Sequence, residues 1–169
     1  MGMVKKIGVS IYNEYEAIQA AELGVDYIQV PYNIFDQRLD GTVFWEVAKK
    51  NKVSVFARSP FLQGLLLMQP DHLPKHLVYI RPCLEQFIEI IERYHLSATE
   101  ASLFFAEKHC LADHIVFGVD TLSQLQENIS IIENPKIVSG GEWIQEMENC
   151  FKNFNRGVVN PSLWSKIKV

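Results

Sequence analysis

The sequence has few cysteines and no concentrated run of basic or apolar residues, and each scarcity excludes a class of protein. Its three cysteines are odd in number and lack metal-ligand spacing, so we expect reduced thiols in a cytoplasmic protein. Lys and Arg are nowhere concentrated and the net charge is −4, which argues against nucleic acid as a partner. The longest apolar run near the start is too short to span a bilayer, and no signal peptide precedes it, so we expect no membrane partner.

Low-complexity segments and interdomain linkers are also missing, which indicates a single domain over residues 1–169. A chain of this length can bury a substantial core. His72 and His76 have the i, i+4 spacing of two metal ligands on a helix. Pro74 lies between them and no third ligand is nearby, so we interpret both as solvated loop residues and expect no metal site.

Apolar segments alternate with helical patterns along most of the chain. The spacing from strand to loop to helix is the one that parallel crossovers need, so the sequence predicts an α/β fold with four βα units, extra helices and a C-terminal tail. The predicted strands are Lys6–Ser10, Tyr27–Val30, Val53–Ala57 and His114–Val119. The predicted helices are Glu14–Leu23 (with Leu23 toward the core and Gly24 as the cap), Thr42–Asn51, Pro82–Tyr94, Thr99–His109, one from Thr121, and Gly141–Phe151.

The pattern loosens between Phe61 and Arg81. This stretch contains Gly64, Pro70 and Pro74 and is too long for an ordinary connection between a strand and a helix. Long irregular connections in compact domains are commonly binding loops or lids, so we expect one of these here.

The stretch from His114 to Ile129 joins a strand, a turn at Gly118 and a capped helix. Thr121 and Gln124 have the spacing of a capping box, in which both side chains satisfy free backbone N–H groups. Such a helix start is suited to a phosphate, and Gln124, Glu127 and Asn128 share one helix face on which adenine could lie. An ordinary βα unit without a ligand has the same pattern and remains the alternative.

Residues suited to a binding site stand at the carboxyl ends of the predicted strands. Parallel α/β proteins build their sites at this edge of the sheet. These residues are Ser10, Gln29, Arg58 and Gly118. Arg58 is the strongest candidate, because a charge at a strand end beside Pro60 needs a partner or a ligand. The alternative for Ser10 and Gln29 is that they are ordinary polar residues at strand ends.

Several motifs in register resemble the aldo/keto reductases, with the bacterial branch the most similar. They are Ile7-Gly-Val-Ser10, Ile28-Gln-Val-Pro-Tyr-Asn33, Ala57-Arg-Ser-Pro60 with Gln63-Gly-Leu65, Phe117-Gly-Val119 with Gln124-Leu-Gln-Glu-Asn128, and Asn160-Pro-Ser-Leu-Trp164. The resemblance covers nearly the whole chain. It implies the second half of a (βα)8 TIM barrel, which binds NADPH without a Rossmann fold.

The resemblance also implies roles for individual residues. Ser10 and Gln29 would hold the nicotinamide carboxamide, and Arg58 would flank the nicotinamide ring. Ser59, Phe61, Gln63 and Gly64 would follow the pyrophosphate, while Gln124, Glu127 and Asn128 would contact the adenosine end. Gly118 and Val119 stand where many members carry a phosphate-binding Lys-Ser pair, so the choice between NADP(H) and NAD(H) stays open. Ile11 replaces an asparagine that usually follows the serine.

The family's catalytic Asp, Tyr, Lys and His come from the first half of the barrel, and this chain begins where that half ends. None of its tyrosines has the catalytic sequence context, so we expect no catalytic residue here. One interpretation is a reductase half that works after joining a separate N-terminal half, or that was cut from a complete enzyme. The first and last strands would leave unpaired apolar edges, so we expect a homodimer or a separate N-terminal half as the partner. The alternative is a non-catalytic remnant that self-associates or only binds a nucleotide.

Overall fold

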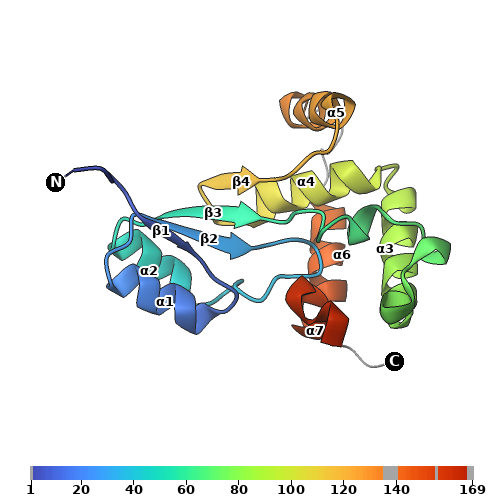
Figure 1. The fold of residues 1–169 in the computed structure, drawn as a ribbon. Coiled ribbons are helices and arrows are strands. Elements are labelled where there is room, and N and C mark those ends of the chain that lie inside the picture. The colour runs from blue at the N-terminus through green and yellow to red at the C-terminus, as the bar shows by residue number, and fades with distance from the viewer. Residues whose placement is uncertain (1, 135–140, 155, 167–169) are drawn as a thin grey trace.

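The computed structural model describes residues 2–134, 141–154 and 156–166, and its centre is one parallel sheet with the strand order β1-β2-β3-β4 (Figure 1). The predicted α/β fold with four βα units is confirmed. The strands are β1 Gly8–Ser10, β2 Tyr27–Pro31, β3 Ser54–Arg58 and β4 His114–Val116. The helices are α1 Glu14–Glu22, α2 Phe44–Lys50, α3 Arg81–Arg93, α4 Ala98–His109, α5 Leu122–Glu133, α6 Glu142–Phe151 and α7 Arg156–Val159. Short 3-10 turns span Leu65–Leu67, Pro70–His72, Lys75–Ile80 and Pro161–Lys166.

The two faces of the sheet differ in their cover. Ile28, Val30 and Val55 are buried against the alanines of α1 and against α2, because alternate side chains of a strand point to the same face. The other face carries Tyr27, Gln29, Phe56, Arg58 and His114, which are half-buried or exposed. We call these five residues the open face. In a closed barrel the corresponding face would be the interior.

Helix α1 begins and ends where the local sequence signals it. The Asn13 side chain accepts a hydrogen bond from the Glu16 N–H at 2.9 Å, and Gly24 with φ of +83° closes the helix, as predicted. Leu23 is 85% exposed, so its predicted place in the core was wrong. The helix ends at Glu22, and Leu23 lies past the apolar stripe formed by the alanines.

The segment from Phe61 to Arg81 was expected to be a lid or a binding loop, and the second alternative fits its first part, which lines a cavity. It folds into three 3-10 turns, and its apolar side chains recur often enough to anchor the backbone in the core. The buried residues of this segment are Leu62, Leu65, Leu66, Leu73, Leu77 and Ile80. Its first part, up to Leu67, borders this cavity, and the buried residues that follow hold it in place.

The C-terminal tail packs beyond the carboxyl ends of the strands. Helix α6 lies against α3, and the Phe35 ring contacts Phe151 and Phe154 with centroids 4.9 and 4.3 Å away. The described part of the tail therefore completes the core at this end and does not cover the open face (Figure 1).

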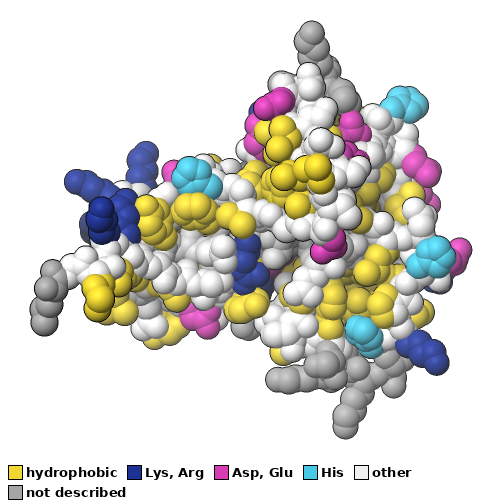
Figure 2. Space-filling model, turned by 45° about the horizontal axis from the view of Figure 1, so that its top comes forward, with side chains coloured by type: hydrophobic (Ala, Val, Ile, Leu, Met, Phe, Trp, Pro, Cys, Tyr) yellow, Lys and Arg dark blue, Asp and Glu magenta, His cyan; other side chains and the backbone are white. Residues whose placement is uncertain are grey.

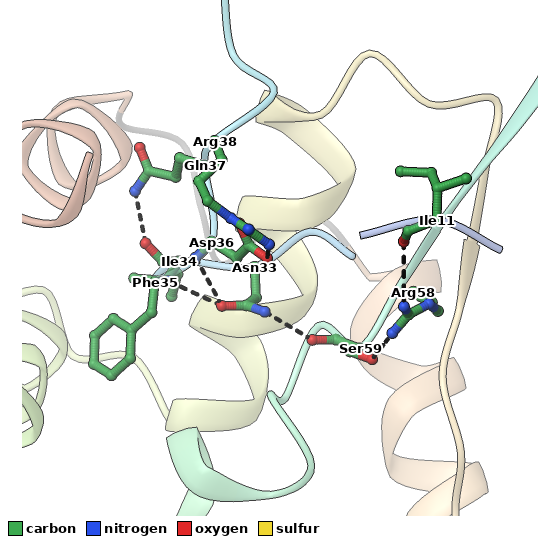
Figure 3. A network of polar contacts seen from close by, with 9 residues as sticks. All are labelled: Ile11, Asn33, Ile34, Phe35, Asp36, Gln37, Arg38, Arg58 and Ser59. Carbon is green, nitrogen blue, oxygen red and sulfur yellow. Dashed lines mark hydrogen bonds and ion pairs between the residues drawn. The ribbon is translucent and has the colours of Figure 1, made fainter. Parts of the chain in front are cut away.

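The loop after β2 is buried, although it contains the polar residues Asn33, Asp36 and Gln37. The Asn33 Oδ1 atom accepts hydrogen bonds from the Phe35 and Asp36 N–H groups, and its Nδ2 atom donates to the Ser59 carbonyl at 3.1 Å (Figure 3). Asp36 accepts two hydrogen bonds from Arg38, at 2.6 and 2.8 Å. This network ties the end of β2 to the residue that follows β3, so it positions Ser59.

Candidate functional site

A cavity of about 700 Å³ opens at the carboxyl ends of β2, β3 and β4. It gathers eleven of the twelve residues proposed for the nucleotide, all but Ser10. These eleven are Gln29, Arg58, Ser59, Phe61, Gln63, Gly64, Gly118, Val119, Gln124, Glu127 and Asn128. They come from four separate segments, so the fold brings together what the resemblance had assigned to one ligand.

Arg58 connects the twelfth residue to this group. Its Nε atom donates to the Ser10 hydroxyl at 3.2 Å, and its other nitrogens reach the Ser59 hydroxyl and the Ile11 carbonyl at 3.4 Å. The guanidinium also lies 4.7 Å from the centroid of the Tyr12 ring. Arg58 thus has partners in the protein. These three hydrogen bonds use three of the five N–H donors of the guanidinium, so it can still donate to an anion.

The loop that follows β3 has an unusual backbone where it borders the cavity. Ser59, Leu62, Gln63 and Gly64 all have positive φ, between 46° and 84°. A non-glycine residue in the left-handed region costs about 1–3 kcal/mol and persists only where the surroundings hold it. The buried Leu62 side chain and the Asn33 bond to Ser59 supply that support. The result is a tightly curled backbone along one wall of the cavity.

The start of α5 contains the predicted capping box, with a consequence that the sequence did not reveal. Thr121 Oγ1 accepts from the Gln124 N–H, and Gln124 Oε1 accepts from the Asp120 and Thr121 N–H groups at 2.8 and 3.1 Å. Three N–H groups and the Gln124 oxygen are therefore used within the protein. The phosphate predicted at this helix start therefore has fewer N–H groups available than expected, those of Leu122 and Ser123 and the Gln124 amide NH₂.

The charges of the cavity are unevenly placed. Among the described residues that line it, Arg58 is the cation, at the sheet end, while Asp120 and Glu127 lie at the α5 end. A carboxylate suits a hydroxyl group and repels a phosphate, so the α5 end favours a ribose over a phosphate ester.

Six lining residues were not predicted as site residues. Val116, Phe117 and Asp120 adjoin predicted ones, and Pro60 and Leu67 continue the loop after β3. Thr99 belongs to α4 and had no signal in the sequence, because only the packing of α4 against α5 brings it to the cavity.

Other chemical candidates are less suited to a site. Burial raises the pKa of the Cys110 thiol to about 12, so it stays protonated and is a poor nucleophile. Within the described ranges, no group of three His, Cys, Asp or Glu side chains is placed to hold a metal ion. No helix that the structure describes is long and apolar enough to cross a membrane.

Comparison with known proteins decides the family. A profile of the aldo/keto reductase family matches residues 1–140 of the chain. The chain belongs to the aldo/keto reductase family. Among curated proteins, none matches it. Among solved structures, the chain is similar to the aldo-keto reductase AKR11C1 from Bacillus halodurans in its holo form, with a TM-score of 0.63 and 18% identity. The match covers 88% of this chain and 51% of the solved one.

This aldo/keto reductase chain thus spans about half the length of the solved structure that it resembles. At 18% identity the likeness shows the fold alone. The four parallel strands correspond to about half of an aldo/keto reductase barrel, which confirms the predicted half-barrel.

Proposed function

We propose that this chain forms the nucleotide-binding half of an NAD(P)H-dependent carbonyl oxidoreductase. The observation that carries the proposal is that the residues matched to cofactor contacts line one cavity at the carboxyl edge of the sheet. Catalytic Asp, Tyr, Lys and His would come from a separate N-terminal half, in the cytoplasm. The second candidate is a remnant that binds a nucleotide without catalysis, and it has the same cavity in its favour.

The residues at the sheet end suit a nicotinamide. Ser10 and Gln29 would hold the carboxamide, and the planar Arg58 guanidinium would flank the ring, held in place by Ser10 and Ile11. The curled loop from Ser59 to Gly64 would follow the pyrophosphate. When bound, the nicotinamide supplies the hydride, and this half of the site binds and orients it.

The α5 end suits an adenosine without a 2′-phosphate. Asp120 and Glu127 border the cavity there, and Gly118 and Val119 offer no cation or hydroxyl. We therefore propose that NAD(H) binds at least as well as NADP(H).

Nucleotide binding is the direct test. Isothermal titration calorimetry of the purified chain should give weak binding of NADH, because half a site lacks its enclosing walls. NADPH should bind no tighter, because Asp120 and Glu127 border the α5 end of the cavity. Arg58→Ala should weaken NADH binding about tenfold, the effect of losing about 1.4 kcal/mol from a hydrogen bond to a charged group. Arg93→Ala is the matched control, since Arg93 lies on α3 outside the cavity. Equal affinities for the wild type and Arg58→Ala would remove the assignment.

Turnover by the chain alone is a separate test. We expect no NADPH- or NADH-dependent reduction of a generic aldehyde, because a positioned general acid contributes about 10²–10⁴-fold and none is matched here. Nucleotide absorbance in the presence of the aldehyde measures the rate. Steady turnover that a single substitution in this chain abolishes would contradict the expectation.

A further inference from the structure

Arg58 is a charge without a counter-charge at the sheet end of the nucleotide cavity. Its hydrogen-bond partners are the hydroxyls of Ser10 and Ser59 and the carbonyl of Ile11. Its guanidinium also lies over the Tyr12 ring, at 4.7 Å from the centroid. All four groups are neutral, and none of the ion pairs formed among the described residues includes Arg58. Because an arginine side chain does not deprotonate in proteins, the cavity carries a full positive charge here.

The groups around the cavity do not neutralise this charge. The buried Asp36 carboxyl is near Arg58, but it accepts two hydrogen bonds from Arg38, at 2.6 and 2.8 Å, so that pair adds no net charge. The acidic residues that line the cavity, Asp120 and Glu127, lie at its α5 end. Figure 2 shows that the Lys and Arg side chains of this face gather mainly at the amino ends of the strands, away from the cavity. Arg58 therefore sets the electrostatic potential at the sheet end of the cavity.

The two redox forms of a nicotinamide nucleotide differ in charge at one place, the ring. The oxidised ring is a cation and the reduced ring is neutral, whereas the riboses, the diphosphate and the adenine are the same in both. A fixed cation beside the ring therefore acts on the difference in affinity between the two forms. Two like charges about 4 Å apart repel by an amount that corresponds to about a fivefold change in affinity in water, and to more in a half-buried site.

We propose that Arg58 makes the cavity selective for the reduced nucleotide, so that NADH binds about fivefold or more tightly than NAD⁺. The inference rests on the proposed function, because it needs the nicotinamide ring beside Arg58. The planar guanidinium can stack on a neutral ring, while it repels a cationic one. Such a site takes up NADH from a mixture that contains excess NAD⁺, which favours carbonyl reduction over alcohol oxidation.

The competing role for Arg58 is a contact with the diphosphate, and the two roles have different consequences. The diphosphate is common to NADH, NAD⁺ and ADP-ribose, so an arginine that binds it changes the affinity for all three alike. An arginine beside the ring changes the ratio between NADH and NAD⁺. The hydrogen bond from Arg58 to Ser10 at 3.2 Å favours the ring, because Ser10 is matched to the carboxamide that the ring carries.

Calorimetric titrations of the purified chain with NADH, NAD⁺ and ADP-ribose test this selectivity. The wild type should bind NADH about fivefold or more tightly than NAD⁺. Arg58→Gln removes the charge and keeps a planar polar group, so it should bring the ratio of the two affinities close to one. Arg58→Lys keeps the charge and should keep most of the preference. Arg93→Ala, on α3 outside the cavity, should have the ratio of the wild type.

The three ligands separate failure of the inference from failure of the proposed function. Equal affinities of the wild type for NADH and NAD⁺, or a preference that survives in Arg58→Gln, would overturn the inference and leave nucleotide binding in place. A loss of equal size for all three ligands in Arg58→Gln would assign Arg58 to the diphosphate and would overturn it as well. A wild type that binds none of the three ligands would contradict the proposed function, and the inference would fall with it.

Discussion

Phe35→Ala should lower the free energy of unfolding by about 3–5 kcal/mol, the usual effect of truncating a buried phenylalanine. The Phe35 side chain is 1% exposed and stacks on Phe154 at 4.3 Å, with Phe87 and Phe151 also against it. Its loss removes the contact between the loop after β2 and the C-terminal tail. Urea unfolding measures the change, and we expect the midpoint of thermal unfolding to fall by about 10 °C for a chain of this size.

Two controls separate this role from general loss of apolar surface. Phe35→Leu keeps most of the buried volume and should recover more than half of the stability. Phe61→Ala removes a ring that is only partly buried and borders the cavity, so it should cost less. A loss below about 1 kcal/mol for Phe35→Ala would mean that the tail is not held through this ring.

Arg38→Met should destabilise the protein in a pH-dependent way. The Asp36 side chain is 2% exposed and Arg38 25% exposed, and burial raises the pKa of Asp36 while the Arg38 hydrogen bonds hold part of that rise back. Without Arg38 the pKa of Asp36 rises further. A carboxyl with a raised pKa in the folded state contributes stability below its unfolded pKa of about 4, and this contribution is lost as the pH rises through the folded value.

The variant should therefore lose the most stability at high pH. We expect a loss of about 3 kcal/mol near pH 8, the lower end for removing one partner of a buried ion pair, and a smaller loss near pH 5, where Asp36 takes up a proton. Urea unfolding across this range measures both values. In the double variant Asp36→Asn with Arg38→Met, the pH-dependent part should vanish. An equal loss at both pH values in the single variant would exclude Asp36 as its source.

Local signals predicted the elements well. The four strands and the main helices lie within a few residues of their expected bounds, although β1 begins at Gly8 and β4 ends at Val116. The capping box predicted at Thr121 also forms, and the structure has a second one at Ser97. Helix caps and alternating apolar residues act over a few neighbours, so a linear sequence contains enough information to place them.

The sequence predicted most of the site. The motifs indicated eleven residues that now line one cavity, and the spacing of Thr121 and Gln124 indicated the capping in which the Gln124 oxygen is used. They did not show that Thr99 borders the cavity, because its place depends on how α4 packs against segments far away in the chain.

The sequence by itself determined the order of strands and helices, the caps, the family and the residues placed at the carboxyl ends of the strands. Only the tertiary structure decided that the polar loop from Asn33 to Gln37 is buried, that the segment from Phe61 to Arg81 belongs to the core, and that Leu23 does not. The physical reason is that burial depends on contacts between segments far apart in the chain. Asn33 is satisfied by its own loop and by Ser59, 26 residues away, and no local pattern specifies that bond.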